Sequence, residues 1–229
     1  MPNLSLIARR ARTRLKNEGI RRTVEVGQYH LNELWYDFRH GVRTCGYISL
    51  SSLGIAQDAC NDYSPAEVDS LSRVLKNIGI EEQRDVFIDF GSGLGRVVLA
   101  AAMFPLRTVI GVEFSSALNQ IAEKNVQQMR AKLICKDIRL IQSDATCFTI
   151  PSDATLFFFF NPFGNPVLSA VLHNIHQSIL AAPRQVKILY VPPLRQSETS
   201  VDHCDWLVRQ ASVRTRLGRE LRIYVNQAA

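Results

Sequence analysis

Residues 86–98 read VFIDFGSGLGRVV and are the most informative segment of the chain. The first five residues are apolar apart from Asp89, which predicts a buried strand, and a helix is predicted to follow the glycines. Glycines let the intervening loop turn sharply and approach a ligand closely, and a helix N-terminus favours a carboxylate or phosphate there. We therefore expect a ligand site at this loop, formed by Asp89, Gly91, Ser92, Gly93 and Gly95.

Helices and strands alternate regularly around this unit. Ser64-Pro65-Ala66-Glu67 matches a capping box with proline at the first helical position, which predicts a helix from Ser64. Further helices are predicted over residues 97–104, 116–129 and 167–180. Further strands are predicted over residues 108–112, 138–141, 154–160 and 186–191, followed by an antiparallel hairpin with strands over 206–216 and 220–226.

This order of elements predicts an α/β fold. We expect an open, mostly parallel seven-strand sheet with a C-terminal antiparallel hairpin, helices on both faces and a small helical N-terminal extension. Residues 1–63 are expected to form that extension, a basic amphipathic arm followed by an aromatic-rich helical lid. Residues 64–229 are expected to form the ligand-binding domain.

Polar residues follow the predicted strands at their carboxyl ends, where an open parallel sheet binds its ligand. Glu113 ends the second strand and can accept two hydrogen bonds from ribose hydroxyls. Asp144 follows the third strand and can accept a bond from the exocyclic amine of adenine. Asn161 follows the fourth strand and begins Asn161-Pro162-Phe163.

Taken together, the glycine loop and these later residues resemble the class I, Rossmann-like S-adenosylmethionine-dependent methyltransferases over roughly residues 64–226. The resemblance implies that S-adenosyl-L-methionine is the cofactor and that residues 64–229 bind it. It implies that the glycine loop faces the methionine part of the cofactor, that Glu113 binds the ribose and Asp144 the adenine. It also places Phe163 near the transferable methyl group.

Two further motifs imply the kind of acceptor. Tyr63-Ser64-Pro65 and residues 87–98 are similar to seven-strand lysine methyltransferases of the telomeric-silencing type and their bacterial relatives, in which the tyrosine loop closes over the cofactor. Asn161-Pro162-Phe163 resembles the N-P-P-Y/F motif of amino-group methyltransferases, where the asparagine side chain and a proline carbonyl accept hydrogen bonds from the attacking amine. The second proline is absent here, which counts against nucleobase methylation. The acceptor is therefore expected to be an amine, either a protein lysine or a small amine, and a glycan or a lipid headgroup stays open as an alternative.

Two other classes of function compete with this interpretation. A nicotinamide-dependent oxidoreductase would need G-x-G-x-x-G, but Arg96 stands where that pattern has its third glycine. A non-catalytic cofactor-binding or interaction domain is the other alternative. No metal is expected, because His173 and His176 have no cysteine or carboxylate cluster beside them.

The basic charge of the chain is confined to its N-terminal arm. The 229 residues carry a net charge of +6, and residues 1–23 hold seven basic side chains against one acid. Apolar residues recur there at helical spacing, at Leu4, Ile7, Ala8, Ala11 and Leu15. The arm could pack on the domain as a surface helix, contact an anionic membrane or nucleic acid weakly, or act as a transit peptide.

Five scattered cysteines, an odd number without a C-x-x-C pair, argue against a disulfide framework and favour a reducing compartment. No window holds the roughly 18 apolar residues of a membrane span. We therefore expect a cytoplasmic protein, with peripheral membrane contact through the arm as a further option. The aromatic residues Trp35 and Tyr36 of the lid are candidates to contact the sulfonium of the cofactor, after Tyr63.

Overall fold

A computed structural model describes residues 4–49, 51, 61–193 and 199–227, with some side chains of the first helix excepted. The strands are β1 (Val86–Phe90), β2 (Thr108–Glu113), β3 (Asp137–Gln142), β4 (Leu156–Phe160), β5 (Lys187–Val191), β6 (Leu207–Arg214) and β7 (Glu220–Asn226). The helices are α1 (Leu4–His40), α2 (Val68–Asn77), α3 (Arg96–Ala101), α4 (Ser116–Met129) and α5 (Asn165–Ala181). Helices and strands alternate as the sequence predicts.

The strands form one sheet in the order β3-β2-β1-β4-β5-β7-β6. The first five strands pair in parallel, and β7 is antiparallel to both β5 and β6. The predicted seven-strand, mostly parallel sheet with a C-terminal antiparallel hairpin is therefore confirmed. β1 and β4 are neighbours although β2 and β3 lie between them in sequence, so the strand order reverses at this point.

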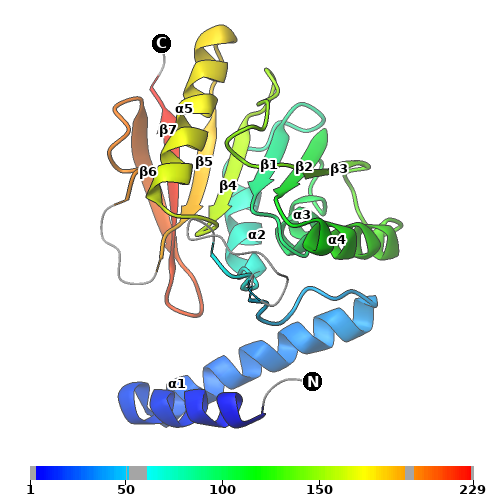
Figure 1. Cartoon of the computed structure of the whole chain (residues 1–229), viewed down its shortest axis with the longest axis vertical. Helices are drawn as coiled ribbons and strands as arrows, with labels where there is room; N and C mark the ends of the chain where they lie inside the picture. The colour runs from blue at the N-terminus through cyan, green and yellow to red at the C-terminus, as the bar shows by residue number, and fades with distance from the viewer. Residues whose placement is uncertain (1–3, 50, 52–60, 194–198, 228–229) are drawn as a thin grey trace.

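The two faces of the sheet have separate apolar cores, because successive side chains of a strand point to opposite faces. In β4, Phe158 packs with residues of α2, α3 and α4, whereas Phe157 and Phe159 pack with residues of α5. Figure 1 shows α5 on one face of the sheet and α2 behind it. The phenylalanines of β4 thus contribute to the apolar cores on both faces of the sheet.

The predicted capping box at Ser64-Pro65-Ala66-Glu67 is wrong. Helix α2 begins at Val68, its N-cap residue is Glu67, and no side chain caps it. The Glu67 carboxylate instead accepts hydrogen bonds from Thr215 Oγ1 at 2.6 Å and from the Leu217 backbone N–H at 2.8 Å. This acid holds the β6–β7 turn against the start of α2, so its side chain is not available for the capping role.

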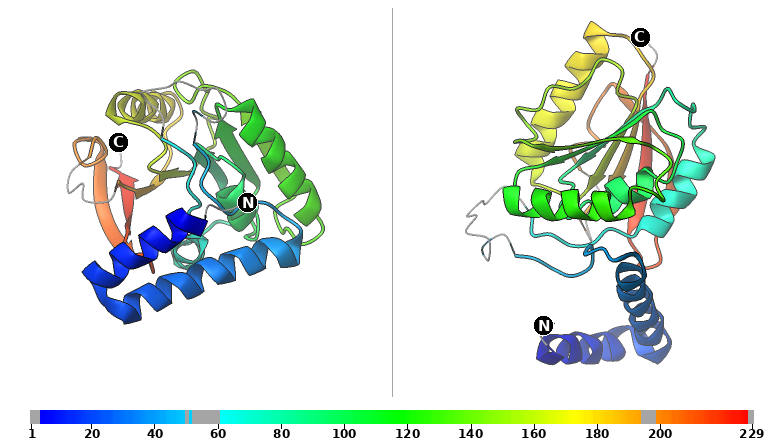
Figure 2. Two further views of the ribbon diagram at one scale, coloured as in Figure 1. Left: turned by 60° about the horizontal axis from the view of Figure 1, so that its bottom comes forward. Right: turned by 90° about the vertical axis from the view of Figure 1, so that its right-hand side faces the viewer.

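The N-terminal extension contains one long helical element, α1, which lies beyond the carboxyl ends of the parallel strands (Figures 1 and 2). Gly19 interrupts it with a φ of 81°. The described part of the expected arm and the first part of the expected lid therefore lie in one broken helix, whereas residues 41–49 after it are not helical. Of the apolar residues predicted for the arm, only Leu15 has a described side chain, and it is exposed. Among the described residues, no helix is long and apolar enough to cross a membrane.

Candidate functional site

A cavity of about 400 Å³ opens at the carboxyl ends of β1, β2 and β4, where the strand order reverses. Such a volume suits a small ligand or cofactor. Ten of the eleven site residues predicted from the sequence line this cavity: Tyr63, Asp89, Gly91, Ser92, Gly93, Glu113, Asp144, Asn161, Pro162 and Phe163. The topology thus brings together residues that are up to a hundred positions apart in the chain.

Three glycines of the loop after β1 have positive φ angles, which side chains rarely adopt. A Cβ on Gly91 would lie 2.5 Å from Pro162 Cβ, and one on Gly93 would overlap the ring of Tyr63. Gly95 does not line the cavity: its Cβ would lie 3.0 Å from Ala122 Cβ of α4. The first two glycines therefore shape the cavity, and Gly95 allows α3 and α4 to approach each other.

Glu113 is buried and its carboxylate is oriented by backbone amides. Its Oε2 accepts from Gly93 N at 2.8 Å, and its Oε1 accepts from Ser115 N at 2.8 Å. Burial raises the pKa of Glu113, while these backbone bonds, which favour the charged form, oppose the shift. The glycine loop is thereby tied to the end of β2.

Asp89 and Ser92 each present a buried polar atom without a partner. Within the described part of the chain, Asp89 Oδ2 and Ser92 Oγ make no hydrogen bond. Burial, and then the charge of Glu113, raise the pKa of Asp89 well above its ordinary value. A buried carboxylate oxygen without a donor is costly unless a ligand supplies one. Both residues line the cavity, so a bound ligand with a cationic or hydrogen-bond-donating group would provide the missing partner.

Asp144 is exposed at the rim of the cavity. Its Oδ1 accepts hydrogen bonds from the backbone N–H and the hydroxyl of Thr146, at 2.8 and 2.7 Å. These bonds fix the direction of the carboxylate after β3.

Asn161 and Pro162 form the opposite wall, with acceptor atoms engaged by a residue that the sequence did not single out. Asn161 has a φ of 43°, a conformation that asparagine tolerates better than most residues. Asn61 Nδ2 donates to Asn161 O at 2.9 Å and to Asn161 Oδ1 at 3.3 Å, and Asn61 N donates to Pro162 O at 3.1 Å. Asn61, two residues before Tyr63, therefore lies against this wall.

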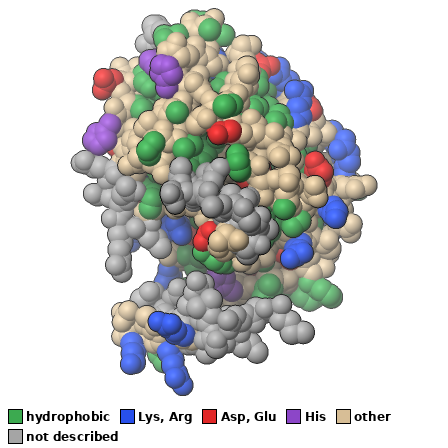
Figure 3. Space-filling model, viewed as in Figure 1, with side chains coloured by type: hydrophobic (Ala, Val, Ile, Leu, Met, Phe, Trp, Pro, Cys, Tyr) green, Lys and Arg blue, Asp and Glu red, His purple; other side chains and the backbone are tan. Residues whose placement is uncertain are grey.

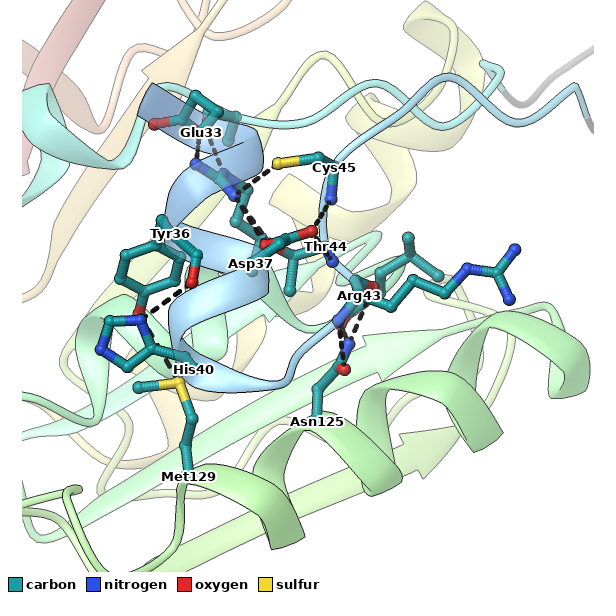
Figure 4. A network of polar contacts seen from close by, with 12 residues as sticks. Glu33, Tyr36, Asp37, His40, Arg43, Thr44, Cys45, Asn125 and Met129 are labelled. Carbon is teal, nitrogen blue, oxygen red and sulfur yellow. Dashed lines mark hydrogen bonds and ion pairs between the residues drawn. The ribbon is translucent and has the colours of Figure 1, made fainter. Parts of the chain in front are cut away.

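Tyr63 connects the cavity to the N-terminal extension. Its hydroxyl donates to Thr44 O at 2.7 Å, and burial raises its pKa well above the ordinary value. Thr44 is in turn held by Asp37 of α1, which accepts from the Thr44 backbone N–H, the Thr44 hydroxyl and Cys45 N, each at 2.7 Å (Figure 4).

Arg96, the first residue of α3, completes this connection. It is 4% exposed and ion-pairs with Glu33 of α1. It also donates to Ala66 O at 3.0 Å and to Thr44 Oγ1 at 2.7 Å. The sequence marked Arg96 only as a departure from a dinucleotide pattern. We call Glu33, Asp37, Thr44 and Arg96 the clasp, because they fasten α1 to the helix that follows the glycine loop.

The lid aromatics do not reach the cavity. Trp35 is 58% exposed and lies against Phe38, and Tyr36 contacts Met129 and His40. Neither Trp35 nor Tyr36 lines the cavity, so the expectation that they contact the sulfonium is wrong. The helical face that carries Trp35 points away from the domain, because the opposite face supplies Glu33 and Asp37 to the clasp.

Comparison with known proteins agrees with this geometry. Residues 56–145 match the family model described as histone methylation protein DOT1. A histone-lysine N-methyltransferase of Drosophila melanogaster, specific for H3 lysine-79, is 38% identical over 63 residues. That match covers 27% of this chain and only 3% of the Drosophila protein.

Solved structures resemble a larger part of the chain. The magnesium protoporphyrin IX methyltransferase of Synechocystis, solved with bound S-adenosylmethionine, has a TM-score of 0.52 and 15% identity over 70% of this chain and 78% of that one. The ribosomal protein L11 methylase of Lactobacillus delbrueckii subsp. bulgaricus has a TM-score of 0.52 and 12% identity, over 73% and 81%. This chain has the class I methyltransferase fold.

The methyltransferase fold accounts for the position of the cavity. A dinucleotide-binding sheet has the order 3-2-1-4-5-6, whereas here antiparallel β7 lies between β5 and β6. The topology therefore disfavours the nicotinamide-dependent alternative. Among the described residues, no group of three or more histidine, cysteine or acidic side chains could hold a metal ion.

Proposed function

We propose that this protein is an S-adenosylmethionine-dependent methyltransferase whose acceptor is an amine, with a protein lysine as the preferred acceptor. The proposal is carried by one cavity that combines the glycine loop, Glu113 and Asn161-Pro162-Phe163. The local likeness to a lysine-specific enzyme supports the choice of lysine. A small amine is the alternative acceptor.

The cofactor end of the cavity is suited to each part of S-adenosylmethionine. The unpartnered Asp89 Oδ2 matches the ammonium group of the methionine part. Glu113 keeps lone pairs for ribose hydroxyls beyond those that accept from Gly93 and Ser115. We assign Asp144, which lines the cavity, to the exocyclic amine of adenine, and we assign Tyr63, which lies against Gly93, as a cover over the cofactor.

The acceptor end is suited to an amine held in line with the methyl group. When bound, the cofactor supplies an already activated methyl group, so catalysis by the protein is mainly positioning. Asn161 Oδ1 and Pro162 O are the acceptors for amine N–H groups, and an entering amine replaces Asn61 there or uses the second lone pair of each oxygen.

A lysine must be neutral before it can attack. Phe163 is 8% exposed and Phe160 lines the same cavity. These apolar side chains disfavour an ammonium ion that enters between them and so lower its pKa. The aromatic wall therefore favours the reactive form of the acceptor without a dedicated base.

Labelled methyl transfer into fractionated lysate, followed by acid hydrolysis, tests the proposal. We expect methyllysine in the protein fraction. Asn161→Ala should lower turnover at least tenfold with nearly unchanged S-adenosylmethionine affinity, because Asn161 is assigned to the acceptor. Exposed Asn165, which does not line the cavity, provides the control variant Asn165→Ala. Label in lipid or nucleic acid would contradict a lysine acceptor, and label in no fraction would favour a non-catalytic domain.

We also propose weak contact of residues 1–23 with an anionic surface. Figure 3 shows Lys and Arg side chains gathered on the part of α1 farthest from the domain. Exposed apolar residues lie in the same segment, Leu15 at 47% and Ile20 at 72%. Basic charge beside apolar side chains favours the surface of an anionic membrane over a neutral one. A cytoplasmic location remains our proposal, supported by four described cysteines that are all free.

A further inference from the structure

Arg219 places a cation on the acceptor side of the cavity. It lies on the turn between β6 and β7, and because Tyr190 of β5 pairs antiparallel with Arg222 of β7, this turn lies at the carboxyl end of β5. The guanidinium carbon of Arg219 is 5.0 Å from the ring centroid of Phe160, the last residue of β4. Both side chains line the cavity beside Asn161.

The guanidinium of Arg219 has no anionic partner. Among the described residues it makes no ion pair and no side-chain hydrogen bond, whereas Arg216 on the same turn pairs with Asp69 at 3.5 Å. Burial lowers the pKa of Arg219, opposed by the charge of Glu67. Glu67 does not neutralise it directly, because the Glu67 carboxylate accepts from Thr215 and Leu217.

Three acids of the cavity lie at its other end, whereas Asp62 lines the cavity next to Asn61. Asp89 lies in β1, Glu113 ends β2 and Asp144 follows β3, all on the far side of β4 from the β6–β7 turn. Arg96, the other arginine that lines the cavity, pairs with Glu33, so among the described residues Arg219 is the cavity-lining cation without an ion pair. Phe160 covers one face of the guanidinium, which leaves its N–H edge, a geometry that matches a carboxylate.

We propose that Arg219 binds a carboxylate of the methyl acceptor, so that the preferred acceptor is a lysine flanked by Asp or Glu. This inference rests on the proposed function and specifies its substrate class. Arg219 acts as a specificity-determining residue: it touches the acceptor beside the reacting nitrogen and has no part in holding the cofactor.

The test is binding of two fluorescein-labelled peptides to the full-length protein loaded with S-adenosylhomocysteine. Both peptides carry one central lysine, flanked on each side by Asp in one and by Asn in the other. A charge-assisted pair predicts about 10–100-fold tighter binding of the Asp peptide. Arg219→Ala should reduce that preference to less than about twofold, and Arg219→Lys should keep part of it.

Charge reversal separates recognition from a structural role. Arg219→Glu should prefer a peptide in which Arg flanks the lysine, an outcome that loss of packing against Phe160 cannot produce. Arg216→Ala is the matched control, because it removes a charge from the same turn outside the cavity, and it should keep the wild-type preference.

Equal binding of the Asp and Asn peptides to the wild type, or binding of neither, would overturn the proposal. So would an equal effect of Arg216→Ala and Arg219→Ala. Calorimetry with S-adenosylhomocysteine and labelled methyl transfer are measured separately. If the methyltransferase assignment is wrong, the calorimetry and the methyl-transfer assay will show it. The selectivity between the two peptides tests the role of Arg219 separately.

Discussion

Gly93 and Tyr63 are in contact where the cofactor is assigned, so a side chain at Gly93 would push the Tyr63 ring out of place. We expect Gly93→Ala to weaken S-adenosylmethionine binding at least tenfold. Gly79→Ala is a matched control, because Gly79 also has a positive φ, of 70°, but has open space around it. Both variants carry backbone strain, and calorimetry should find reduced affinity only in Gly93→Ala. Equal affinities in the two variants would remove the loop from the cofactor site.

Replacing Asp89 by asparagine should stabilise the ligand-free protein but weaken its binding of S-adenosylmethionine. Its pKa is raised in the folded protein, so its contribution to stability is present at low pH and is lost as the pH rises through the folded-state value. At about pH 8 we expect Asp89→Asn to raise the melting temperature of the ligand-free protein. At about pH 5 the rise in melting temperature should be smaller.

The same variant should bind S-adenosylmethionine about 10–100-fold more weakly, because the ammonium group loses its charged partner. Thermal denaturation at both pH values and calorimetry measure the two effects. A lower ligand-free melting temperature together with unchanged affinity would contradict this role for Asp89.

Among the elements, α1 depends on the clasp for its attachment to the domain. Removing one partner of a buried ion pair leaves the other uncompensated and costs about 3–5 kcal/mol. Arg96→Ala should therefore lower the free energy of unfolding by about that amount and speed hydrogen exchange in residues 28–40. Arg84→Ala is the control, since its pair with Glu81 is exposed and worth about 0–1 kcal/mol. Equal losses in chemical denaturation would show that the clasp adds no stability.

The strands could be predicted from the sequence because their signals are local. Buried parallel strands are continuous apolar runs, and two acids stand out in them: Asp89 lies within such a run and Glu113 ends one. The start of α2 could not be predicted, because the partners of Glu67 lie 148 and 150 residues away. Local spacing fits a capping box equally well.

The same limit applies to the site. The cavity-lining glycines and acids follow from position in a strand–loop–helix unit, whereas the roles of Arg96 and Asn61 depend on which distant segment packs against them. Arg96 pairs with α1, and Asn61 reaches Asn161 across a hundred residues. No sequence pattern encodes these contacts. The arginine directly after the glycine loop could have been recognised as unusual, but its partners could not.

In the molecule as a whole, the basic arm and the neutral domain should be separable. Residues 1–23 precede Glu33 and Asp37, so their deletion leaves the clasp intact. We expect the full chain to bind vesicles containing phosphatidylserine weakly, at about 1 kcal/mol per basic residue near the surface, and to release them at high salt. The truncated protein should bind no vesicles.

The truncated protein should also keep the S-adenosylmethionine affinity of the full chain, since every assigned cofactor residue lies at or after Tyr63. Deletion of residues 1–40 is the contrasting variant, because it removes Glu33 and Asp37 and leaves Arg96 buried without them. Loss of cofactor binding in the shorter deletion would show that the arm itself supports the site.

The most direct test of the account is a calorimetric titration of the full chain with S-adenosylmethionine and, separately, with NAD. The cavity, the unpartnered Asp89 carboxylate and the order of the sheet predict one site for S-adenosylmethionine and no measurable heat with NAD. The affinity for S-adenosylmethionine should fall at least tenfold in Glu113→Ala, because this variant loses the acceptors for the ribose hydroxyls. Binding of NAD, or no binding of S-adenosylmethionine, would contradict the assignment.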